Sequence, residues 1–355
     1  MRVPLDGRRL SRAVVAVALL ALAGGTGCAA RPDSHGGPSA GAVPSRSPTA
    51  AVPGMYLYRY ADADGVTVND ILYRPPGGGW QPVATVRGPA TPSPTMFAVA
   101  PDHRHVAWIL AGQLRVSALD GGQVTTVAGD VANPSCQVPK WTADSRQLLF
   151  VTTPGRGKPT TTSVANTIQA VNADGTGPHV LGTTLDPTGC GDLASADGST
   201  VYALVRPGGK AKLVAFGASG RDVAVTWPAD QQLHEMLAAS TGDTRLLVTT
   251  VDSSFPCCAT PADRYAVVDP GTGRVTSLDT ANDKQGSIAV SGAFTADGRV
   301  VLIADHYRDQ GTEEFGRGHA GDHQEFLTVF APDGTVLGGA ELPSVGYGYL
   351  VGLDG

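Results

Sequence analysis

A phrase that occurs five times along the chain constrains its fold more than any other feature. Each copy has a turn built around an aspartate, followed directly by a short apolar run, and the turn residues are Asp102, Asp144, Asp197, Asp243 and Asp297. An aspartate side chain accepts hydrogen bonds from the backbone of its own turn, and a glycine after it supplies the positive φ that some turns need. The phrase therefore predicts antiparallel strand pairs joined by tight turns, which is an all-β pattern.

A second turn follows each of these phrases a few tens of residues later. These turns begin at Asp120, Asp174, Gly217, Asp269 and Asp333, and the stretches before them read as strands at 114–118, 167–171, 213–216, 265–268 and 326–330. The repeating unit is thus a four-stranded antiparallel meander, with strands a to d. Four-stranded antiparallel units that recur along a chain in this way are typical of the blades of β-propellers.

The two ends of the chain complement one another. Residues 347–354 read as a strand a that stops at its turn, whereas 56–60, 70–74 and 82–86 read as the strands b, c and d of the same blade. The sequence therefore predicts a six-bladed β-propeller of four-stranded antiparallel blades, closed by pairing of its N- and C-terminal segments. Such closure leaves the ring without an open seam.

Two stretches carry a resemblance to a known family. Residues 141–150 (Trp-Thr-Ala-Asp-Ser-Arg-Gln-Leu-Leu-Phe) and 171–181 resemble the repeats of the TolB-type, WD40-like propellers of bacterial envelopes. Degenerate versions cover nearly all of residues 55–355. Most copies lack the aromatic residue before the turn aspartate, with Trp141 and Phe294 as exceptions, and nothing resembles the separate N-terminal domain of TolB. The resemblance implies the fold and the envelope, and it does not carry TolB's partners over, because such blades serve scaffolds, ligand binders and enzymes.

The first residues read as an export signal. Arginines precede an apolar run at 13–23 that is too short to span a bilayer, and small residues then lead to Cys28. This arrangement resembles the lipobox of bacterial lipoproteins, although Gly25 stands where that box usually has leucine. The resemblance implies a signal peptide at 1–27 and a lipid on Cys28 that anchors the protein to the outer side of the cell membrane. The alternative is a secretory signal cut after Ala30, which gives a secreted soluble protein.

The remaining chain divides into two parts by composition. Residues 28–53 alternate Pro, Ser, Gly and Ala and predict a flexible tether, and residues 54–355 hold the repeats. The net charge of −6 and the absence of a basic stripe argue against a nucleic-acid partner.

The four cysteines beyond Cys28 suggest disulfides, because an even number is typical of exported proteins. Cys136 and Cys190 precede the first turns of neighbouring blades by similar distances, and we predict a bond between them. Cys257 and Cys258 are adjacent in an inserted loop, where a strained disulfide between neighbours is one of the pairings left open.

Candidate metal ligands occur in one inserted segment of the sixth blade. It contains His306, His319 and His323 together with carboxylates, a set that suits a divalent metal. The segment is rich in glycine and does not hold the rings on one side, so we expect a solvated polar loop without metal or cofactor.

The expected binding surface follows from where the insertions fall. The stretches at 152–164, 251–263 and 304–324 all separate strands b and c, which places them on one face of the ring. The chain has no Gly-x-Ser-x-Gly elbow, phosphate-binding glycine loop or His-Glu-x-x-His motif. We therefore predict a non-catalytic scaffold whose loop-rich face binds another envelope protein or a cell-wall polymer. The alternatives are a small-molecule or glycan site at the mouth of the central channel, and a metal-dependent hydrolase or lyase.

Overall fold

The structure of the protein is a computed structural model. It describes residues 53–63, 65–89, 95–131, 138–152, 166–184, 193–195, 200–205, 212–216, 221–240, 245–252, 264–278, 287–307, 323–342 and 349–354. All of these residues belong to the second of two units into which the chain divides, Arg46–Gly355, and the fold described below is that of this unit. Within the described ranges no helix is long and apolar enough to cross a membrane.

The described residues form six antiparallel sheets of four strands each, which we number as blades in chain order. Blades 1 and 2 contain β24 (Tyr349–Asp354), β1 (Gly54–Ala63), β2 (Val66–Arg74) and β3 (Gln81–Pro89), and β4 (Thr95–Val99), β5 (His105–Leu110), β6 (Gln113–Ala118) and β7 (Thr125–Ala128). Blades 3 and 4 contain β8 (Lys140–Trp141), β9 (Gln147–Thr152), β10 (Asn166–Asn172) and β11 (His179–Thr184), and β12 (Leu193–Ser195), β13 (Val201–Val205), β14 (Lys212–Phe216) and β15 (Arg221–Asp222). Blades 5 and 6 contain β16 (Gln231–Ala239), β17 (Leu246–Asp252), β18 (Arg264–Asp269) and β19 (Arg274–Leu278), and β20 (Ser287–Phe294), β21 (Val300–Tyr307), β22 (His323–Phe330) and β23 (Val336–Glu341).

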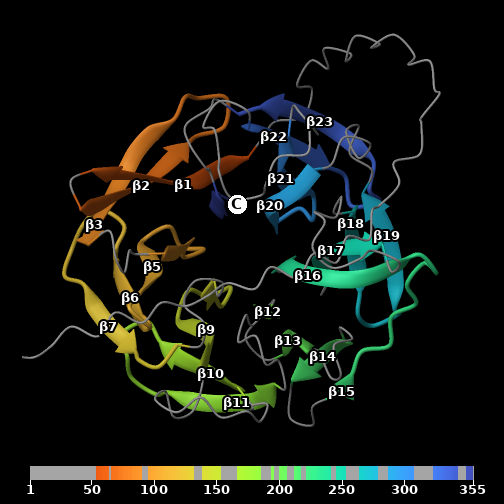
Figure 1. The fold of residues 1–355 in the computed structure, drawn as a ribbon, viewed down its shortest axis with the longest axis horizontal. Helices are drawn as coiled ribbons and strands as arrows, with labels where there is room; N and C mark the ends of the chain where they lie inside the picture. The colour runs from red at the N-terminus through yellow and green to blue at the C-terminus, as the bar shows by residue number, and fades with distance from the viewer. Residues whose placement is uncertain are drawn as a thin grey trace, which may run out of the picture. The chain divides into compact units, whose positions relative to one another are not determined.

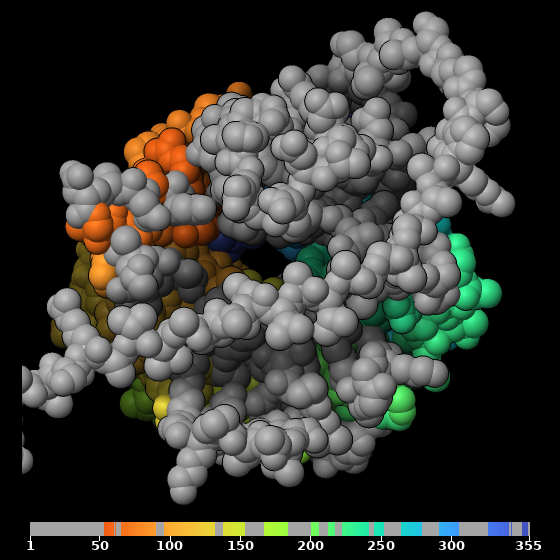
Figure 2. All heavy atoms as spheres, viewed as in Figure 1, coloured from red at the N-terminus to blue at the C-terminus, as the bar shows by residue number. Residues whose placement is uncertain are grey.

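The blades form a closed ring. The first strand of each blade contacts the first strand of the next, in the order β24, β4, β8, β12, β16, β20 and back to β24. Figure 1 shows the last strand of each blade on the outside of this inner set, namely β3, β7, β11, β15, β19 and β23. In the space-filling view, described atoms of the first blade appear in orange at one side of the molecule (Figure 2). The predicted all-β propeller of four-stranded antiparallel blades is confirmed.

The chain termini close the ring as predicted. Strand β24 pairs antiparallel with β1, from Gly54 opposite Asp354 to Tyr58 opposite Tyr349. A contact from the neighbouring blade supports this junction, because Nε2 of His103 lies 3.1 Å from the carbonyl oxygen of Leu353. The first blade is therefore built from both ends of the described chain.

The aspartate turns have the chemistry that the sequence predicts. The carboxylates of five turn aspartates each accept a hydrogen bond from a backbone N–H two residues further on, at 2.8 to 3.1 Å, namely Asp102, Asp144, Asp174, Asp269 and Asp333. In the sixth blade, Arg299 and then the hydroxyl of Thr295 hydrogen-bond to Asp297 and lower the pKa of this carboxyl to about 2. These local bonds hold the two strands on either side of each turn in register.

Apolar side chains fill the spaces between the blades. In the described residues they form one cluster between each pair of neighbouring sheets, and the largest fully buried side chains include Trp108, Tyr265, Phe150 and Phe330. Each blade therefore covers the apolar face of the next, which is how a closed propeller buries a core without helices.

Glycines in the second turn of three blades contact the preceding blade, two of them closely. A Cβ atom on Gly273 would lie 2.5 Å from the carbonyl oxygen of Ala224, and one on Gly334 would lie 3.0 Å from that of Ser277. Gly175 lies against Val127 with more room, because a Cβ atom there would be 3.5 Å from the Cα of Val127. All three have positive φ, so these glycines serve both the turn and the contact between blades.

The hairpin of the first blade is longer than predicted. Residues 61–69 look like a polar connection in the sequence, but β1 and β2 pair through this stretch and reverse at Gly65, whose φ is 77°. Asn69 is fully buried, and both the oxygen and the nitrogen of its side-chain amide have hydrogen-bond partners. It accepts from the Tyr58 hydroxyl and donates to the Val86 carbonyl, both at 3.0 Å.

Candidate functional site

Most of the predicted loop-rich face lies outside the described residues. The inserted stretches at 153–165, 253–263 and 308–322 are among them. The ends of the strands that border the first of these insertions, β9 and β10, are described. The strand ends that border the other two insertions, in β17, β18, β21 and β22, are described as well.

The predicted cysteine sites also lie outside the described residues, namely Cys28, Cys136, Cys190, Cys257 and Cys258. The strands that follow Cys136 and Cys190 are described. They are β8 and β12, the neighbouring inner strands of blades 3 and 4, and they contact each other. The bond between Cys136 and Cys190 stays a prediction.

The candidate metal ligands are only partly placed. The backbones of His306 and His323 belong to β21 and β22, where His306 lies opposite Gln324 and His323 lies opposite Tyr307. The side chains of both residues, and all of His319, lie outside the described part of the chain. Among the described residues, no group of three histidine, cysteine or acidic side chains is close enough to hold a metal ion.

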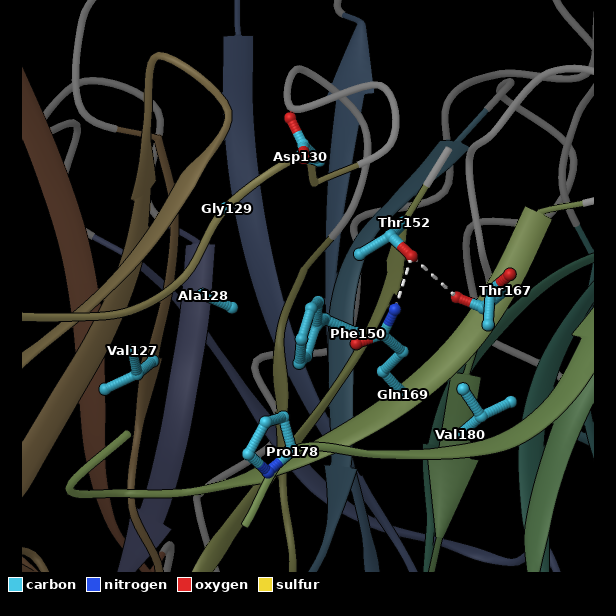
Figure 3. A pocket seen from close by; sticks show the side chains of 10 residues that line it. All are labelled: Val127, Ala128, Gly129, Asp130, Phe150, Thr152, Thr167, Gln169, Pro178 and Val180. Atoms are coloured by element: carbon cyan, nitrogen blue, oxygen red, sulfur yellow. Dashed lines mark hydrogen bonds between the residues drawn. The ribbon is translucent and has the colours of Figure 1, made fainter. Parts of the chain in front are cut away.

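A groove of about 530 Å³ runs between blades 2 and 3. One wall is the end of β7 and the residues after it, and the other is formed by β9, β10 and the start of β11 (Figure 3). The volume falls within the range of ligand-binding pockets. Its described lining residues are Val127, Ala128, Gly129, Asp130, Phe150, Thr152, Thr167, Gln169, Pro178 and Val180.

The polar side chains of the groove gather at the end where the insertion of blade 3 begins and ends. Nε2 of Gln169 donates a hydrogen bond to Oγ1 of Thr152 at 2.8 Å, and this hydroxyl lies 3.5 Å from the carbonyl oxygen of Thr167. Figure 3 shows the three side chains together near this end, with Asp130 on the opposite wall. The bonded pair of Thr152 and Gln169 holds its oxygen atoms in defined positions.

Asp130 owes its position to an unusual backbone. Its φ is 53°, in the left-handed region that aspartate tolerates better than most residues. The next residue, Val131, forms an antiparallel bridge with Thr152 and donates a backbone hydrogen bond to Gly112 at 3.0 Å. The chain is thereby tied to both blades, and the exposed Asp130 lies at the polar end of the groove.

The other end of the groove is apolar. Phe150 is buried and its ring lies between β7 and β10, while Pro178 and Val180 line the outer part (Figure 3). Val180 is 62% exposed, the largest exposed fraction among the large apolar side chains in the described ranges. An apolar stretch that continues into hydroxyl, amide and carboxylate groups suits binding of an amphipathic ligand. The described lining includes neither a nucleophile beside a base nor a pair of carboxylates.

A second feature lies inside the ring. Nζ of Lys140 donates a hydrogen bond to the carbonyl oxygen of Leu237 at 3.0 Å. Lys140 belongs to β8 of blade 3 and Leu237 to β16 of blade 5, so this side chain passes the inner strand β12 of the blade between them. It places an ammonium group among the inner strands. The alternative small-molecule or glycan site is predicted at the mouth of the channel that these strands surround.

Sequence reasoning did not single out the residues of the groove. Thr152 and Thr167 border the predicted insertion and could have been found as its base. Val127, Asp130 and Val180 gave no signal, because they meet only when blades 2 and 3 pack together.

No protein-family model matches the chain, and no curated protein sequence matches it. Several solved structures are similar in fold. They include the putative TolB from Agrobacterium tumefaciens, at 12% identity and a TM-score of 0.48 over 74% of this chain and 84% of that one. Another comes from the nidogen/laminin complex, at 13% identity and a TM-score of 0.47 over 83% of this chain and 96% of that one. The β-propeller domain of the Trilobed protease from Pyrococcus furiosus gives 13% identity and a TM-score of 0.46 over 84% and 98%. The strand topology of the chain is that of a β-propeller, and its structural neighbours include the putative TolB and other propellers.

Proposed function

We propose that the protein is a non-catalytic binding scaffold of the bacterial envelope, which holds another envelope protein or a cell-wall polymer through the loop-rich side of its propeller. The observation that carries this proposal is the groove between blades 2 and 3. It combines an exposed apolar side chain, Val180, with a polar end built by Thr152, Gln169 and Asp130 on a closed ring of strands. A rigid frame with an amphipathic groove at the base of a long loop is typical of a recognition surface.

Site-specific cross-linking in living cells tests the binding role. A photoreactive side chain replaces Val180 in the full-length protein, and a second variant carries it at Ala296, which is exposed in a tight turn of blade 6. We expect one defined adduct with an envelope protein or polymer from position 180 and none from position 296. Equal labelling at both positions, or none at position 180, would contradict the proposal.

The envelope location rests on the N-terminal sequence, which lies outside the described residues. We propose that Cys28 carries a lipid that anchors the protein to the outer side of the membrane. The variant Cys28→Ala should still be exported but should leave the detergent phase, because the acyl chains supply the membrane affinity. Unchanged partitioning would show that the anchor lies elsewhere.

A further inference from the structure

The groove between blades 2 and 3 has an uneven distribution of charge. Of its described lining residues, only Asp130 carries a charge, and it lies at the polar end. The same lining contains no lysine, arginine or histidine that would neutralise this carboxylate. The whole chain also has a net charge of −6, which favours the approach of cations.

The shape of the lining adds a second requirement. A ligand that reaches Asp130 along the groove passes Val180 and Pro178, two exposed side chains that offer apolar contact and no hydrogen bonds, whereas the Phe150 ring is buried. At the polar end, the hydroxyl oxygens of Thr152 and Thr167 and the Asp130 carboxylate can all accept hydrogen bonds. An alkyl chain that ends in a group with several donors and a positive charge matches both ends.

We propose that the groove holds a lysine side chain of a protein partner, with the methylene chain along Val180 and Pro178 and the ammonium group beside Asp130. A lysine ammonium carries three donors and no acceptor, which fits an end that offers carboxylate and hydroxyl oxygens. Its methylene stem packs on apolar surface while the charged head stays near solvent. This inference rests on the proposed binding function, and it names the chemistry of the partner at that site.

The fit also explains why an aspartate stands in a left-handed position. Glycine adopts this conformation at less cost, and asparagine adopts it about as readily as aspartate. The backbone conformation at φ 53° would accept glycine or asparagine at least as well, so the aspartate adds a negative charge that this conformation does not need.

Titration with two small probes tests the proposal on the full-length protein. The probes are Nα-acetyl-lysine methylamide and Nα-acetyl-norleucine methylamide, which share a linear alkyl chain and differ in the ammonium group. We expect the lysine probe to bind in the millimolar range, as single side chains do, and about threefold to fivefold more tightly than norleucine. Raising the salt concentration should weaken only the lysine probe, because its pairing with Asp130 is near solvent.

Three variants locate the effect. Asp130→Asn preserves the left-handed backbone and should reduce the preference for lysine to about twofold or less, without changing the unfolding midpoint. Asp120→Asn removes an equal charge from an exposed turn at the opposite end of β7 and should leave the preference unchanged. Val180→Thr should weaken both probes by a similar factor, because it alters only the apolar wall.

The outcomes separate this inference from the proposed function. If both probes bind equally, or if Asp120→Asn has the same effect as Asp130→Asn, the lysine assignment is wrong even when cross-linking from position 180 succeeds. A cross-linked cell-wall polymer in place of a protein would also overturn the assignment of a protein partner. If the lysine preference holds but no adduct forms in cells, the scaffold function fails and the groove chemistry stands.

Discussion

Replacing Gly273 by alanine tests how tightly the second turn of each blade fits against the blade before it. Gly273 has a φ of 73°, and a Cβ atom there would lie 2.5 Å from the carbonyl oxygen of Ala224 in blade 4. Gly121 provides a matched control, because it occupies the second turn of blade 2 with a φ of 85° and has nothing within 4 Å of its Cβ position. Both substitutions therefore impose the same backbone strain, and only one imposes a collision.

The expected magnitudes follow from these two terms. A left-handed alanine costs about 1–2 kcal/mol, and the lower entropy of the unfolded chain returns about 0.4–1 kcal/mol. Gly121→Ala should therefore lower the free energy of unfolding by about 1 kcal/mol. Gly273→Ala must also move a turn or a neighbouring strand by several tenths of an ångström, which adds about 1–3 kcal/mol of overpacking.

Urea denaturation of the two variants measures the difference. With an m-value of about 3–4 kcal/mol/M for a domain of this size, the midpoint of Gly273→Ala should fall about 0.5 M below that of Gly121→Ala. Equal midpoints would refute the reasoning, because they would mean that the contact with Ala224 relaxes without cost and that the glycine is required only by the turn.

Three further predictions concern charge, covalent links and ring closure. The pKa of Asp297 is lowered to about 2 by Arg299, so its charged form stabilises the fold above about pH 4 and this contribution is lost as the pH falls towards 2. Asp297→Asn should accordingly cost roughly 1 kcal/mol at pH 7, after allowance for solvent screening, and the difference from the native protein should shrink in urea titrations below pH 4. Peptide mapping without reduction should find Cys136 linked to Cys190, and free alkylation of both in the oxidised protein would exclude the bond. Removing residues 349–355 deletes β24 and should abolish cooperative unfolding, whereas deleting residues 31–50 should leave the melting curve unchanged; similar curves for both would contradict closure through β24.

Local chemistry explains why the fold could be predicted from the sequence. The turn aspartates bond to their own backbone within a few residues, and the alternation of these turns with apolar runs recurs along the chain. The two ends of the chain each carry part of a blade, and the sequence shows that the two parts together make one complete blade. The length of the first hairpin could not be predicted in this way, because the buried Asn69 reads as a loop residue until its partners Tyr58 and Val86 are known.

The sequence by itself therefore determined the class of fold and the closure by the termini. Only the tertiary structure decided where the blades meet. The groove joins residues of β7 with residues of β9, β10 and β11, and Lys140 reaches Leu237 from a strand far away in sequence. Turn chemistry acts over a few residues and leaves a mark in the local sequence. The spaces between packed sheets depend on how side chains from separate blades fit together, and no local pattern records that fit.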